Sequence, residues 1–187
     1  MLRLAAAFTL AALAAATLPA PAHAGPPWVS IELPANPLDP ATRGALFVIH
    51  SYHHEASVET PVVCTAEGLV DGARRTLKLT VNETRRSGVR AVRGTVPDDG
   101  MWMVVCVSRE HTASATALVD FAGGDIVRVR VPHRSAEGGR WNIPTEVSAR
   151  QIDAMLRERA RTAKVPVELA GLLVLLLLPA GWLLRRR

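Results

Sequence analysis

The sequence predicts an all-β domain, a β-sandwich of seven or eight strands, followed by a short stalk helix and one C-terminal transmembrane helix. Three observations support this prediction. Short β-rich segments alternate with turn residues at the spacing that is typical of sandwiches. A secretory leader precedes these segments, and a long apolar run lies near the end of the chain. We therefore expect the β domain to fold outside the cytoplasm.

Residues 1–24 have the three parts of a signal peptide. Arg3 supplies a basic start, residues 4–18 form an apolar run, and Ala22-His23-Ala24 is a small-residue cleavage signal. The apolar run is short and rich in alanine, which makes it a weak membrane span. We expect cleavage after Ala24; an uncleaved anchor is the alternative.

The domain proper is expected over residues 25–135. Its predicted strands are 28–33, 45–54, 58–70, 74–81, 89–96, 101–108, 115–121 and 126–131. Asp71-Gly72 is the strongest hairpin signal, because glycine readily adopts the positive φ of a tight turn. Residues 46–49 and 102–107 are apolar at every position, so we expect central strands or strands that another element covers.

Cys64 and Cys106 both lie in predicted strands. In an oxidising compartment a lone pair of cysteines is expected to form a disulfide. Closing a loop of about 43 residues contributes about 4 kcal/mol on the chain-entropy model. Trp102 shares a strand face with Cys106, and a disulfide beside a core tryptophan is typical of immunoglobulin domains. A redox pair or a metal-thiolate site is the alternative, although redox cysteines are normally close in sequence.

Residues 136–164 are interpreted as a linker and a stalk helix. Thr145 is the expected N-cap of a helix over residues 146–163. The expected apolar side of this helix contains Val147, Ile152, Met155 and Leu156.

Residues 165–184 are predicted to cross a membrane. These twenty residues contain one charge, Glu168, and as a helix they span about 30 Å. Trp182 is expected at the membrane interface. The tail is expected in the cytoplasm and anchors the span through Arg185, Arg186 and Arg187. A C-terminal sorting signal and a buried soluble helix are the alternatives.

The charge distribution argues against a nucleic-acid partner. The formal net charge is +5, but the segment between Gly25 and Lys164 contains 18 of the 22 basic and 16 of the 17 acidic residues, a net of +2. Nucleic-acid binding needs a clustered basic face. An enzyme is not expected either, because no pair of residues suggests a general acid and base.

Histidines near the end of the second predicted strand raise the alternative of a metal site. On an extended strand His50 and His54 would lie about 13 Å apart, so a turn after Tyr52 is needed to bring ligands together. Methionine sulfur suits Cu(I). The candidate ligands are His53, His54, His111, Met101 and Met103. The alternative is a polar strand end with methionines that fill gaps in the core.

The segment 45–121 resembles small bacterial extracytoplasmic immunoglobulin-like domains of the copper-resistance and cytochrome-oxidase-assembly kind. The similarity lies in Pro61-Val62, in Gly88-Val89-Arg90-Ala91 and in the run from Pro97 through Trp102 to Val105. The resemblance implies an immunoglobulin-like sandwich. Those families often bind copper through histidine and methionine near the N-terminus. The stretch Gly25-Pro26-Pro27-Trp28 contains neither, so no ligand is carried over.

These observations together predict a non-enzymatic, membrane-anchored interaction or assembly module of the cell envelope, with another envelope protein as partner. A metal (copper or zinc) binding or trafficking module is the first alternative. A glycan- or peptide-binding accessory domain is the second, and an exposed Trp28 or Trp141 on a flat face would favour it.

Overall fold

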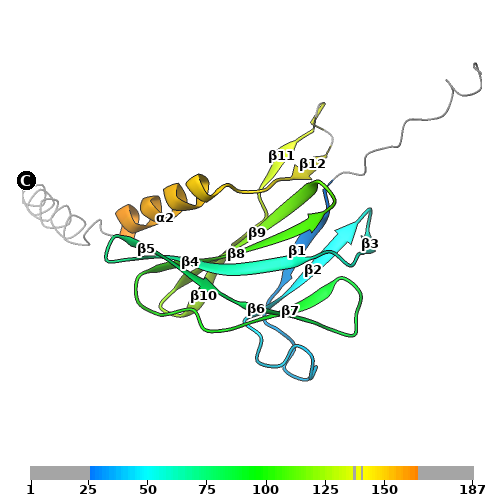
Figure 1. The fold of residues 1–187 in the computed structure, drawn as a ribbon, viewed down its shortest axis with the longest axis horizontal. Helices are drawn as coiled ribbons and strands as arrows, with labels where there is room; N and C mark the ends of the chain where they lie inside the picture. The colour runs from blue at the N-terminus through cyan, green and yellow to red at the C-terminus, as the bar shows by residue number, and fades with distance from the viewer. Residues whose placement is uncertain (1–25, 137, 140, 164–187) are drawn as a thin grey trace, which may run out of the picture.

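A computed structural model describes residues 26–136, 138–139 and 141–163 of the 187-residue chain. This part of the protein is mostly β, with two five-stranded antiparallel sheets, one two-stranded hairpin and one short helix, α2 (Ala149–Ala163) (Figure 1). The prediction of an all-β domain built from antiparallel strands is confirmed.

The first sheet has the order β1-β2-β7-β6, and β3 also pairs with β2. Its strands are β1 (Trp28–Glu32), β2 (Phe47–His53), β3 (Ala56–Ser57), β6 (Thr80–Glu83) and β7 (Val89–Arg93). The second sheet has the order β10-β9-β8-β4-β5. Its strands are β4 (Val62–Val70), β5 (Ala73–Lys78), β8 (Met101–Glu110), β9 (Ala113–Ala122) and β10 (Asp125–Arg130).

Two sequence predictions about strands are wrong in detail. The single strand expected over 74–81 is divided at Leu79, because the chain passes there from the second sheet to the first. Leu79 is buried in the core between the sheets, and its amide donates to the Cys64 carbonyl at 3.2 Å. The end of the expected linker 136–143 instead belongs to β12 (Asn142–Pro144), which pairs with β11 (His133–Ser135).

The central strand β8 is buried on both faces, as its apolar sequence predicts. Trp102, Val104 and Cys106 face the core that the two sheets share. Met103 and Val105 point the other way, into a second apolar cluster beneath α2. Gly68 lies opposite Trp102 in the neighbouring strand, where an added Cβ would come within 2.6 Å of the indole ring. Glycine is therefore required at this position by the tryptophan.

The predicted disulfide between Cys64 and Cys106 is confirmed. The two cysteines lie directly opposite each other on the neighbouring strands β4 and β8, and both are buried. The bridge therefore joins two strands of one sheet, whereas the disulfide of immunoglobulin domains joins the two sheets.

The helix is present, but it begins later than expected. Ser148 caps it instead of Thr145: the Gln151 amide donates to Ser148 Oγ at 3.3 Å, and the Ser148 amide donates to Gln151 Oε1 at 2.8 Å. This reciprocal pair is a capping box. Thr145 instead belongs to the β structure, since its carbonyl accepts the Thr116 amide at 3.2 Å.

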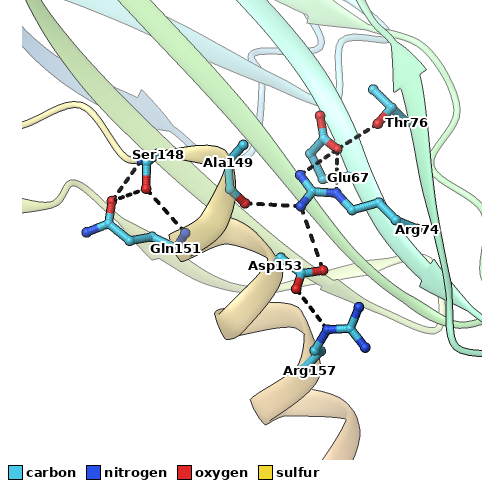
Figure 2. A network of polar contacts seen from close by, with 8 residues as sticks. All are labelled: Glu67, Arg74, Thr76, Ser148, Ala149, Gln151, Asp153 and Arg157. Carbon is cyan, nitrogen blue, oxygen red and sulfur yellow. Dashed lines mark hydrogen bonds and ion pairs between the residues drawn. The ribbon is translucent and has the colours of Figure 1, made fainter.

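The helix packs against the second sheet and is not a free stalk over the described residues. Ile152 and Leu156 are buried against the sheet. Figure 2 shows Arg74 between Glu67 and the first turn of α2, where its guanidinium donates to the Ala149 carbonyl at 3.1 Å. At the other end, Arg159 donates to the carbonyls of Trp102 and Phe121, both at 3.0 Å. The helix is thus attached to the sheet at both ends.

Candidate functional site: an aromatic groove

The best candidate site is a hollow of about 730 Å³ between the start of β1, the end of β2 and the β11–β12 hairpin. We call it the aromatic groove. Its walls are formed by Pro26, Trp28, Tyr52, His53, His54, Glu55 and Trp141, together with Asn142, Ile143 and Pro144. Clefts that bind small organic ligands have volumes of about 300–1,000 Å³.

The pairing of β1 with β2 places Trp28 beside Tyr52. These two residues are direct partners in the antiparallel register, so their side chains are neighbours on the same face of the sheet. Val29 and Ile31 pack in the core, which leaves Trp28 on the outer face. His50 stacks on Tyr52 with 6.0 Å between ring centroids. His50 Nε2 lies 2.9 Å from Glu32 Oε2, and this contact fixes the ring that supports Tyr52.

The two-residue turn between β2 and β3 supplies the next wall. His53 pairs with Ala56, so His54 and Glu55 are the central residues of the turn. Both have positive φ, 47° and 69°. A turn with positive φ at both central residues strongly prefers Asn-Gly or Gly-Gly. The chain uses two residues with full side chains here, and both side chains line the groove.

Polar side chains pair with one another near the ends of β2 and β8. Thr60 and Ser108 are buried, and their hydroxyl oxygens lie 2.6 Å apart. His53 Nδ1 lies 3.3 Å from Glu110 Oε2 at the end of β8, and the His53 ring stacks on His54 at 4.6 Å between centroids. The His53 Nε2 atom is buried and has no hydrogen-bond partner in the structure.

Trp141 stands on the opposite wall and comes from the hairpin that the sequence analysis treated as a linker. The hairpin is held by the Ala136 amide, which donates to the Trp141 carbonyl at 2.9 Å, and by the Thr145 amide, which donates to Pro132 at 3.0 Å. Trp141 is 62% exposed and Trp28 is 42% exposed. Both indole rings are therefore accessible to a ligand.

The groove contains no lysine or arginine among its described lining residues, although the chain has 22 of them. Among these described lining residues the carboxylate is that of Glu55, which is exposed. Proteins bind phosphate and other anionic groups through arginine, lysine or clustered amides, so the described wall of the groove does not favour such groups.

A second hollow, of about 630 Å³, lies between α2 and the strands β9 and β10. Arg130 lines it, but its guanidinium is already bound to the Asp120 carboxylate at 2.9 Å. No aromatic ring other than His133 lines this hollow within the part of the chain that the structure describes. We therefore regard the aromatic groove as the better candidate.

The structure does not bring the five candidate metal ligands together. His53 and His54 line the aromatic groove, and His111 lies in the turn between β8 and β9 next to Glu110. Met101 begins β8 at its other end, and Met103 is buried beneath α2, where its sulfur lies 3.6 Å from Arg130 Nη2. Over residues 26–136, 138–139 and 141–163, no three His, Cys, Asp or Glu side chains form a group that could hold a metal ion.

The predicted membrane anchor, residues 165–184 with Trp182, Arg185, Arg186 and Arg187, lies outside the described residues, as does the predicted signal peptide. Within the described part of the chain, no helix has the length and apolar character that crossing a membrane requires.

Four of the groove residues are candidates from the sequence, namely Trp28, Trp141, His53 and His54, but no sequence pattern places them in one site. No sequence pattern marks Tyr52 or Glu55 as a groove residue. One signal for the hairpin was available: Gly138-Gly139 separates two short segments that pair as β11 and β12. Comparison with protein-family models, with curated proteins and with solved structures finds no match to this chain.

Proposed function

We propose that the chain is a non-enzymatic, membrane-tethered recognition module of the cell envelope, and that it binds its partner in the aromatic groove. One observation carries this proposal: Trp28 and Trp141, from segments far apart in sequence, are both exposed and line the same groove with Tyr52. Exposed aromatic side chains that gather in a concave site are characteristic of binding surfaces.

The proposal that the domain lies outside the cytoplasm is based on the sequence. The leader of residues 1–24 and the apolar run 165–184 support a domain outside the cytoplasm with a single C-terminal span. The disulfide between buried cysteines agrees with an oxidising compartment. Two antiparallel sheets that share one core support a sandwich as the architecture, although the disulfide lies within one sheet and not between the sheets as in immunoglobulin domains.

The groove lies at the end of the domain that is far from the predicted membrane span. Arg159, near the end of α2, contacts the carbonyl of Trp102. His53 contacts Glu110, eight residues further along the same strand, which corresponds to about 26 Å. Figure 1 accordingly shows the C-terminal end of α2 at one side of the molecule and β3 at the other. A chain that enters the membrane soon after Ala163 would present the groove away from the bilayer.

Site-specific photo-crosslinking tests this proposal in cells that produce the full chain. The photoreactive residue p-benzoyl-phenylalanine replaces Trp141 in one variant and Leu38 in a control. Leu38 is 84% exposed and lies in the loop between β1 and β2, at the opposite end from the groove. We expect a discrete adduct from the Trp141 position and none from the Leu38 position. Equal labelling at both positions, or none at the groove, would refute the proposal.

Metal binding is not proposed as a second function, because no observation in the described residues favours it over the groove. Met103 packs in the apolar cluster beneath α2, and Met101 lies at the end of β8 that is far from the histidines.

A further inference from the structure

We infer that the aromatic groove binds a neutral oligosaccharide, with Trp28 and Trp141 as stacking surfaces and with His54 and Glu55 as hydrogen-bonding residues for its hydroxyl groups. This inference rests on the proposed function and names the chemical class of its ligand.

The charge of the groove selects the ligand class first. An arginine-rich chain places no arginine or lysine among the described residues of the groove wall, whereas its other surfaces carry many. Among the described lining residues, an anionic polymer or a nucleic acid would meet the Glu55 carboxylate with no arginine or lysine to offset it. The ligand is therefore neutral or weakly cationic.

The exposed rings of Trp28 and Trp141 narrow the chemical class of the ligand further. Neither Trp28 nor Trp141 belongs to the stacked ring pairs of the structure, which are His50 on Tyr52 and His53 on His54. Their faces are open to a ligand that has flat apolar patches of its own. A sugar ring has such a patch in its C–H face, with hydroxyl groups around its edge. The groove, at about 730 Å³, is far larger than a single trimethylammonium group needs, but it suits a short oligomer.

The backbone of the β2–β3 turn indicates which polar residues take part. His54 and Glu55 occupy positions where positive φ disfavours side chains. Asn-Gly would form the same turn with less strain. Asp71 and His111 also have positive φ, but His54 and Glu55 are consecutive central residues of one turn and both line the groove. The turn therefore keeps two strained side chains on the groove wall.

The hydrogen-bonding character of these residues favours a saccharide over a proline-rich peptide. Aromatic grooves also bind proline-rich segments, whose backbone offers carbonyl acceptors but few N–H donors. A carboxylate such as that of Glu55 serves as a hydrogen-bond acceptor and finds few donors on such a segment. Sugar hydroxyls both donate and accept, so they can pair with Glu55, with a His54 ring nitrogen and with both ends of the Asn142 amide.

Binding of the full chain to defined saccharides tests the inference. The chain is purified in a detergent that has no sugar headgroup and is applied to an array of neutral oligomers of glucose, galactose, mannose and N-acetylglucosamine. Binding of anionic glycans and of a decaproline peptide is tested separately. The affinity of the best neutral ligand is then measured by titration calorimetry. The identity of that ligand distinguishes a cell-wall polymer of N-acetylglucosamine from a storage or capsular glucan.

Two sets of variants make the test specific. We expect Trp28→Ala and Trp141→Ala each to weaken binding of the neutral saccharide at least tenfold, while Leu38→Ala changes it less than twofold. The double variant His54→Asn with Glu55→Gly should weaken binding at least fivefold and at the same time raise the melting temperature. If the turn had a purely structural role, the double variant would be more stable and would bind the saccharide with unchanged affinity.

Three outcomes would overturn the inference: no neutral glycan binds, the tryptophan variants bind as the natural chain does, or decaproline binds in a tryptophan-dependent way and the saccharides do not. If the array is blank while photo-crosslinking at Trp141 yields a protein adduct, the recognition module stands and the saccharide assignment fails.

Discussion

The two ends of the domain are built differently. At the end where α2 finishes, Asp71-Gly72 joins β4 to β5 and Gly123-Gly124 joins β9 to β10, and all four residues have positive φ. At the groove end, positive φ occurs at His54 and Glu55 after β2 and at His111 after β8. The turn after β2 therefore has side chains at both central positions, whereas each of the two turns near the end of α2 contains glycine.

The polar contacts follow the same division. At the α2 end, the buried Asp120 carboxylate binds Arg130 at 2.9 Å and lies 3.3 Å from Arg159. Burial lowers the pKa of the Arg159 guanidinium from its ordinary value, and attraction to Asp120 opposes part of this change. Each end also has a buried polar atom without a hydrogen-bond partner among the described residues, His53 Nε2 at the groove end and Arg130 Nε beside Asp120. The difference between the ends therefore lies in the buried carboxylate that joins two arginines beneath α2 and in the turn that keeps two side chains at positive φ on the groove wall.

The largest expected effect comes from the disulfide, which lies midway between the two ends. Replacing Cys64 and Cys106 together by alanine should lower the free energy of unfolding by about 4 kcal/mol, because the open chain regains loop entropy. Denaturant unfolding measures the loss. Hydrogen exchange should then show reduced protection at both ends; a loss confined to the groove end would mean that the two ends are stabilised independently.

The next effect tests the α2 end alone. Asp120→Ala leaves Arg130 and Arg159 without their shared, buried carboxylate, and removing one partner of a buried pair costs about 3 kcal/mol. Asp153→Ala is the matched control, because Asp153 is more exposed and its pair with Arg157 is screened by solvent, so this variant should lose much less stability. Similar unfolding free energies for the two variants would contradict the division between the ends.

A smaller effect depends on pH. Burial raises the pKa of Glu67, but hydrogen bonds from Thr76, Thr65 and Arg74 outweigh it, so the pKa lies below its ordinary value. A carboxylate with a lowered pKa in the folded state stabilises the fold above the ordinary glutamate pKa of about 4.3, and this contribution is lost as the pH falls through the folded-state pKa. Glu67→Gln should therefore cost about 1.5 kcal/mol at pH 7 and much less at pH 3.

Glu158→Gln provides the control for loss of a carboxylate at the surface, since Glu158 is exposed and lies 3.7 Å from Arg161. Urea unfolding across the pH range provides the readout for both variants. An equal cost of Glu67→Gln at pH 7 and pH 3 would contradict the assigned hydrogen bonds.

The smallest expected effects come from substitutions at positive-φ positions in two turns, one at each end of the domain. Gly72 has φ of +78° and no atom near an added Cβ, so Gly72→Ala should destabilise the protein by about 1 kcal/mol through the backbone alone. His54→Gly should stabilise it by a similar amount for the same reason. Thermal unfolding of both variants gives the comparison directly. A destabilised His54→Gly variant would show that the His54 ring contributes more through its stack on His53 than the turn loses in strain.

The local character of the chain was predictable from sequence. Alternating and continuous apolar runs predicted the strands and the two covered faces of β8, and two cysteines in strands predicted the disulfide, because side-chain periodicity and redox chemistry act over short stretches. The helix was also predicted, although its cap was misplaced by three residues because Thr145 and Ser148 are both good N-caps.

Long-range placement was decided only by the tertiary structure. No local pattern shows that the chain changes sheets at Leu79, that α2 packs on the second sheet, or that Trp141 approaches Trp28 across more than a hundred residues. These arrangements depend on which apolar faces pack together, and that packing is determined by burial of the whole core. The sequence by itself therefore determined the strands, the disulfide and the aromatic residues, while the fold alone brought those aromatic residues into one groove.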